Sequence, residues 1–117
     1  MNIQIDDVTY TVVACRVQDQ WTAHAVGTES GERYGIEVSA PTEAEATLRL
    51  TRWLQWQREH TRALETLQHA ERAYHRAVAG AAFSSADAQI TVTKPARAAM
   101  DAARNNLDDV RARRPNV

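Results

Sequence analysis

The sequence has few of the features that mark specialised classes of protein. Its single cysteine, Cys15, cannot form a disulfide within the chain. No apolar run reaches the roughly 18 residues that a membrane-spanning helix needs. The first residues lack both the basic segment and the long apolar segment of a signal peptide. We therefore predict a cytoplasmic protein that does not enter a membrane.

Neither sign of charge dominates the composition. The 117 residues include 14 lysines and arginines against 15 aspartates and glutamates, which gives a net charge of -1. Proteins that bind nucleic acid through their backbone phosphates carry a clear excess of positive charge, so this balance argues against nucleic acid as a partner. The hydrophobic share of 44% and the charged share of 25% are ordinary for one small globular domain with, at most, an appendage.

The residues that usually perform catalysis or hold cofactors are scattered. Three of the four histidines, His60, His69 and His75, are nine and six residues apart, whereas ligands on one face of a helix are three or four apart. Cys15 lies between apolar neighbours, which predicts a buried small side chain rather than a nucleophile. With four glycines in the chain, no glycine-rich phosphate loop is present. We predict no catalytic residue, metal or cofactor, and hence no enzyme.

The first forty residues alternate between apolar and polar positions, as β-strands do. Ile3 and Ile5 are followed by two aspartates that can turn the chain. Residues 9–17 are apolar at both parities, which predicts a central strand covered on both faces. Further strands are expected at residues 21–26 and from Tyr34 to Val38. The short connections predict an antiparallel meander of three or four strands.

The periodicity changes to that of a helix after Pro41. Thr42 and Glu45 form a capping box, and neither proline nor glycine follows until Gly80. A continuous helix over 42–79 is therefore expected, with a length of about 57 Å at 1.5 Å per residue. Such a helix is about twice as long as the small sheet, so its first half should cover the sheet. Trp53 is predicted to be the main anchor there, with Trp56 partly exposed.

The second half of this helix predicts a helical hairpin. Residues 80–94 resemble a linker, and Pro95 suits the first turn of a second helix over 95–113. The fold class is thus α+β: a small antiparallel sheet, a long helix and an antiparallel helical hairpin. We divide the chain into a sheet domain, residues 1–57, and a hairpin, residues 58–117.

The apolar positions of the hairpin follow a near-heptad spacing, which is typical of helices that pack along their length. A hairpin of two helices buries only one side of each helix, so some of these positions are expected to contact a second copy of the chain. The predicted interface residues are Trp56, Leu64, Leu67, Tyr74, Met100 and Leu107.

Residues 8–56 show the order strand–strand–strand–helix. The segments Tyr10-Thr-Val-Val, Trp21-Thr-Ala, Thr42-Glu-Ala-Glu-Ala and Trp53-Leu carry a resemblance to HicB-type antitoxins. That resemblance implies a regulatory protein that binds a protein partner or nucleic acid. The same order is similar to part of a double-stranded RNA-binding domain, but Glu43 and Glu45 at the helix start would repel phosphate.

Two functions follow from these patterns. The first is a non-enzymatic interaction or assembly module that forms a homo-oligomer, most simply a dimer, through its helical hairpin. The alternative is an antitoxin-like regulatory protein that binds a protein partner or nucleic acid.

Overall fold

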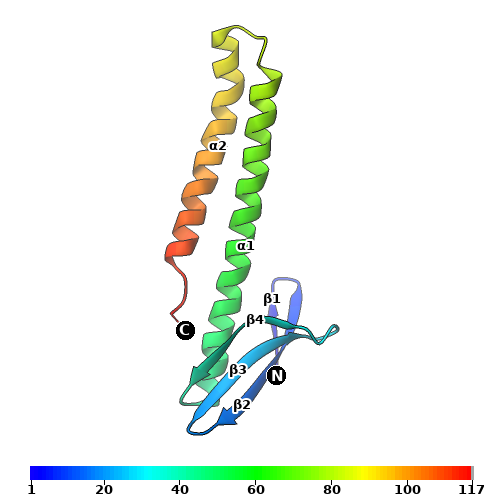
Figure 1. The fold of residues 1–117 in the computed structure, drawn as a ribbon, viewed down its shortest axis with the longest axis vertical. Coiled ribbons are helices and arrows are strands. Elements are labelled where there is room, and N and C mark those ends of the chain that lie inside the picture. Colours follow the sequence, from blue (N-terminus) through cyan, green and yellow to red (C-terminus); the bar gives the residue numbers. More distant parts are fainter. Residues whose placement is uncertain (117) are drawn as a thin grey trace. The chain divides into compact units, whose positions relative to one another are not determined.

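The fold, seen in a computed structural model that describes residues 1–116, is a four-stranded sheet followed by two long helices (Figure 1). The elements are β1 (Asn2–Ile5), β2 (Val8–Val17), β3 (Gln20–Gly27), β4 (Arg33–Ala40), α1 (Glu43–Gly80) and α2 (Ala86–Ala112). The predicted α+β class, with its antiparallel meander and helical hairpin, is confirmed.

The sheet has the simplest antiparallel order, β1-β2-β3-β4, in which each strand pairs with its neighbour in sequence. Tight turns at residues 6–7 and 18–19 make this order possible. Asp6 and Gln18 adopt positive φ angles of 59° and 56° in these turns. Turns of this handedness match the natural twist of paired strands, so the register of the first three strands is set locally.

Strand β4 carries a β-bulge that interrupts its regular alternation. Ala23 pairs with Val38 while Ala25 pairs with Tyr34, so β4 holds two more residues than β3 over this stretch. Gly35 lies in the bulge with a φ of +72°, and a Cβ there would come within 3.1 Å of Leu54 Cδ2. The bulge lets α1 approach the sheet closely at this point.

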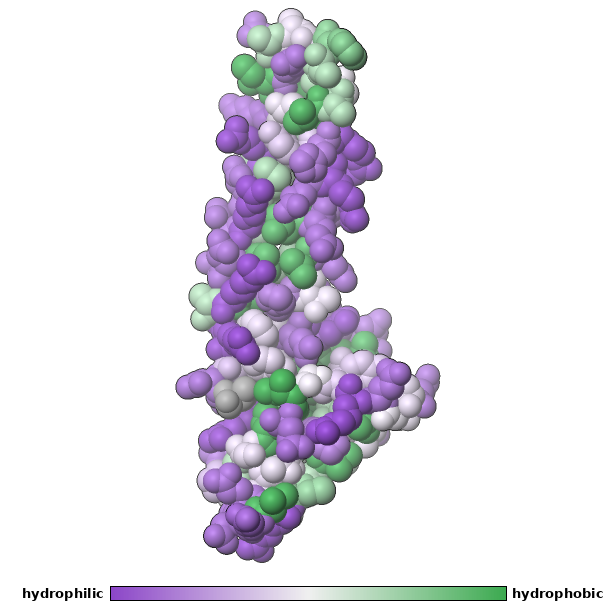
Figure 2. Space-filling view, in the orientation of Figure 1, coloured by the Kyte–Doolittle hydropathy of each residue, from purple (hydrophilic) through white to green (hydrophobic). Residues whose placement is uncertain are grey.

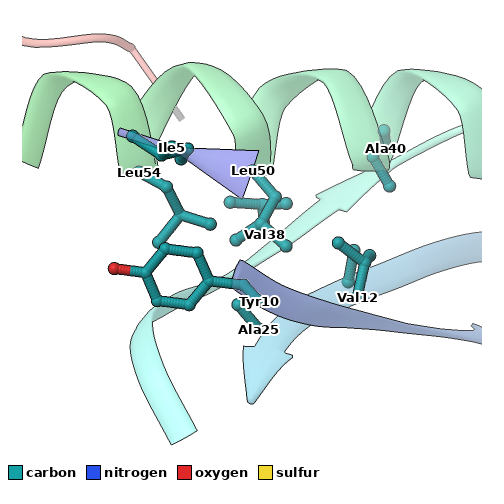
Figure 3. Close-up of a cluster of buried hydrophobic side chains, with 10 residues drawn as sticks. Ile5, Tyr10, Val12, Ala25, Val38, Ala40, Leu50 and Leu54 are labelled. Atoms are coloured by element: carbon teal, nitrogen blue, oxygen red, sulfur yellow. The ribbon is translucent and has the colours of Figure 1, made fainter. Parts of the chain in front are cut away.

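The core of the sheet lies between its one covered face and the first part of α1 (Figure 3). Leu50 is 0% exposed and is the largest fully buried side chain of the described residues. The buried residues of this cluster are Ile5, Tyr10, Val12, Ala23, Ala25, Val38, Ala40, Ala46, Leu50 and Leu54. Alanines at the centre of β3 leave room for the larger leucines of the helix.

Only one face of the sheet is covered, which corrects the prediction for residues 9–17. Tyr10 and Val12 face α1 and are buried, whereas Cys15 is exposed and Val17 is 53% exposed on the opposite parity. The prediction that Cys15 is buried is therefore wrong. The apolar residues at both parities predicted the strand correctly. The sequence of a strand does not reveal whether a second layer of the structure covers its other face.

Helix α1 begins as the capping residues predict. The Thr42 hydroxyl oxygen accepts a hydrogen bond from the Glu45 amide at 3.2 Å. Two arginines then connect the helix to the sheet: Arg49 donates to the Ser39 carbonyl at 2.8 Å, and Arg58 lies 3.3 Å from the Asp6 carboxylate. These polar contacts flank the apolar cluster and fix which side of α1 faces the strands.

Helix α2 begins nine residues earlier than Pro95, so the predicted linker over 80–94 is wrong in its extent. The Ser85 side chain accepts a hydrogen bond from the Ala88 amide at 3.3 Å and caps the helix. The Gln89 side-chain amide donates to the Ser84 carbonyl at 3.0 Å and further secures the turn. Pro95 lies inside α2, where it removes one backbone donor without ending the helix.

The chain divides into two units. Among the described residues, the sheet unit comprises residues 1–58 together with 114–116, and the hairpin unit comprises residues 59–113. Helix α1 supplies residues to both units, since it runs without interruption from Glu43 to Gly80.

Leu50 and Leu48 offer a matched test of this packing, because the two leucines lie on the same helix with exposures of 0% and 48%. Leu50→Ala is expected to lower the free energy of unfolding by about 2–5 kcal/mol through the lost contacts and the cavity. Leu48→Ala should cost less than about 1 kcal/mol. Urea denaturation followed by circular dichroism measures both, and equal costs would contradict the described packing of α1 on the sheet.

Candidate interaction surface

The seam of the hairpin unit combines alanines from α1 with mostly larger residues from α2. Its buried residues are Ala63, Ala70, Ala81, Met100, Ala103, Leu107 and Val110. Small side chains let the two helices approach closely, but each alanine removes little apolar surface from water. The contacts within one hairpin therefore bury a small apolar area for the length of helix involved.

The larger apolar side chains of α1 in this unit are incompletely buried. Leu67 and Tyr74 pack against the cluster of Ala70, Met100 and Ala103, yet both keep part of their surface exposed. Leu64 is also half-buried. These three residues, which we call the flank stripe, have apolar surface that the second helix of the same chain does not cover.

Two of the six predicted interface residues lie elsewhere. Met100 is 7% exposed and Leu107 is 3% exposed, because both belong to the seam between α1 and α2 of one chain. In the folded hairpin they present almost no surface to a second copy, so we reassign them to the hairpin core. Tyr74 of α1 packs against the cluster that contains Met100.

The two ends of the hairpin unit differ in the number of charged side chains that they carry. At the end nearer the sheet unit in sequence, Arg113 lies 3.5 Å from the Glu59 carboxylate, and Arg111 Nε donates to His60 Nε2 at 3.4 Å. Such exposed polar contacts contribute little to stability, but they orient the helices. The turn end, residues 77–93, carries much less charge, since Asp87 is its single charged residue.

The turn end, residues 77–93, is here called the hairpin tip. It exposes Val78, Phe83, Ile90 and Val92, and in Figure 2 apolar residues gather around the turn between α1 and α2. Asp87 is the single charged residue of this 17-residue segment, in a chain with 25% charged residues. The scarcity of charged residues in this segment indicates an interaction surface. The prediction of a linker over 80–94 did not include such a surface.

The sheet unit holds a separate cluster of aromatic and cationic groups. The rings of Trp53 and Trp56 lie 5.2 Å apart, and the guanidinium carbon of Arg114 lies 5.0 Å from the Trp53 ring and 5.8 Å from the Trp56 ring. A guanidinium at these distances is attracted by the negative faces of both indoles. Trp56, a predicted interface residue, is thus half-buried and contacted by the chain's own C-terminal segment.

Trp53 is 7% exposed, which confirms the predicted rotation of α1, with Trp53 buried and Trp56 less so. Its indole Nε1, however, is buried without a hydrogen-bond acceptor among the described residues. A buried donor without a partner costs about 1–3 kcal/mol. The packing of the large ring must outweigh this penalty for the arrangement to be stable.

Within residues 1–116, no group of three histidine, cysteine, aspartate or glutamate side chains is arranged to hold a metal ion. Neither helix in that range has an apolar stretch of the length and purity that crossing a bilayer requires.

No protein-family model matches the sequence, and neither a curated protein nor a solved structure matches it. The resemblance of residues 8–56 to HicB-type antitoxins thus stays a prediction.

The unpaired indole nitrogen leads to a test of Trp53. Trp53→Ala is expected to cost about 3–5 kcal/mol of the free energy of unfolding, because a large buried ring is lost. Trp53→Phe should cost far less, since it keeps an aromatic ring and removes the unsatisfied donor. Trp56→Ala is the control at the half-buried neighbour. Chemical denaturation ranks the three variants, and a larger loss for Trp56→Ala than for Trp53→Ala would refute the described burial.

Proposed function

We propose that this chain is a non-enzymatic interaction module that self-associates through its helical hairpin. The observation that carries the proposal is that α1 buries its small side chains in the hairpin unit and leaves its larger apolar side chains partly exposed. On α1 the buried positions of this unit are Ala63 and Ala70, while the larger Leu64, Leu67 and Tyr74 remain half-buried. A stable helix pair usually buries its largest apolar residues.

A second hairpin would supply the missing cover. Burying a leucine side chain fully contributes about 1.5–3 kcal/mol, so completing the burial of the flank stripe in two copies favours association. Two hairpins packed together give a four-helix arrangement, which is a common way for short helical pairs to form a complete core. A symmetric pair uses the same surface twice and therefore closes at two copies.

The mass of the protein in solution tests this proposal. Light scattering at micromolar concentration should give twice the chain mass of 13.1 kDa. Leu64→Glu should shift the population to the single-chain mass, because it places a carboxylate in an apolar contact. Leu64 suits the test better than Leu67, which also packs on the cluster inside the hairpin.

His69→Glu is the matched control, since His69 is exposed, lies about 140° around α1 from Leu64, and also gains a carboxylate. It should keep the dimer mass. A wild-type chain that stays at 13.1 kDa throughout the micromolar range would contradict self-association.

A further inference from the structure

The hairpin tip combines a protruding aromatic side chain with a groove that is lined by uncharged residues. Phe83, in the turn between α1 and α2, is fully exposed. Beside it is a groove of about 460 Å³ whose lining residues are Val78, Ala81, Ala82, Gln89, Ile90 and Thr93. None of these six side chains is charged, and Ala82 of the groove directly precedes Phe83 in the chain.

The charges around the tip restrict what can cover it. The tip holds one charged residue, Asp87, in the first turn of α2. The adjacent cations, Arg76 and Lys94, lie just outside the segment, one on each helix. A carboxylate at the tip disfavours insertion into lipid, because an ionised group is costly in a bilayer and is repelled by anionic headgroups. A strongly charged protein partner finds no complementary charge on this surface.

A second copy of the same tip meets these requirements. It offers an uncharged groove, with Val78 and Ile90 in its lining, to receive Phe83, and an exposed Phe83 to fill the groove of the first copy. We propose that two chains associate tip to tip, with Phe83 of each copy seated in the groove of the other. This arrangement rests on the proposed self-association and adds a second contact to it. When two hairpins pack side by side with their turns at the same end, one two-fold axis brings both the flank stripes and the tips together, so the assembly closes at two chains.

The available area agrees with a reversible dimer. A phenylalanine side chain buries roughly 150–250 Å². Together with the exposed Val78 and Ile90 of each groove, the tips of two copies therefore supply on the order of 800 Å² of buried surface. That is the lower end of what specific interfaces bury, so the dimer should dissociate on dilution.

Sedimentation velocity over a range of concentrations tests the arrangement. Phe83→Ser should raise the dissociation constant at least about tenfold, because each dimer loses two buried rings. The variant should keep the wild-type helix content, since Phe83 contacts solvent in the single chain. Leu48→Ser, the same kind of change at an exposed leucine of the sheet unit, is the control and should leave the dissociation constant unchanged.

Mixing two variants tests the reciprocal contact itself. Ile90→Arg obstructs the groove but keeps Phe83, whereas Phe83→Ser keeps the groove. Each variant alone should associate more weakly than the wild type. An equimolar mixture should regain part of the lost affinity, because Phe83 of the first variant can enter the intact groove of the second, which restores one of the two contacts. If both variants have raised dissociation constants and their mixture binds no more tightly than either variant alone, the reciprocal seating of Phe83 is wrong.

The remaining outcomes separate this inference from the proposed function. If Phe83→Ser dimerises as tightly as the wild type while Leu64→Glu dissociates, the tip contact is wrong and self-association through the flank stripe stands. If the wild type is monomeric at every concentration, both fail. Phe83-dependent binding to phosphatidylcholine vesicles by a monomeric chain would likewise overturn the tip contact and assign the tip to lipid.

Discussion

Helix α1 is the element on which the rest of the structure depends. This one continuous helix packs on the sheet with its first part and on α2 with its second part. Its first part contributes Leu50, Trp53 and Leu54 to the sheet unit. Beyond residue 58 its buried positions become alanines, beginning with Ala63 and Ala70. Side-chain size along one helix therefore changes at the boundary between the units, and with it the amount of apolar surface that each unit can bury within one chain.

That change gives the two units different energetics. The sheet unit buries aromatic and branched side chains against α1, adds polar contacts from Arg49 and Arg58, and has a core that is complete on its covered face. In the hairpin unit the buried positions of α1 are alanines, and its larger Leu64, Leu67 and Tyr74 are incompletely buried. A unit of the second kind gains stability from any partner that binds only its folded form, by simple mass action. Self-association would thus contribute to the stability of the hairpin itself.

Much of the fold could be predicted because its determinants are local. Alternating residues mark the strands, and Thr42 marks the start of α1 through a hydrogen bond to the amide of Glu45. The exposure of Cys15 could not be predicted, since periodicity reports the shape of a strand and not the layers around it. The early start of α2 depends on Ser85 and Gln89, whose hydrogen bonds secure a turn that resembles a linker in composition.

The candidate surface shows the same limit. Heptad spacing identified the residues that line the hairpin, but spacing alone did not separate the side chains that meet within one chain from those left over for another. Met100 and Leu107 proved to belong to the first group. The exposed tip was missed because Phe83 and Ile90 lie in a segment with no regular spacing, where the informative signal is the near absence of charge.

Hydrogen exchange at two protein concentrations tests the central claim that the hairpin depends on association while the sheet does not. Amides of α2 should become more protected at the higher concentration, because only the folded hairpin forms the dimer. Amides of β2 and β3 provide the internal reference and should exchange at the same rate in both samples. Protection of α2 that does not change with concentration would contradict the account.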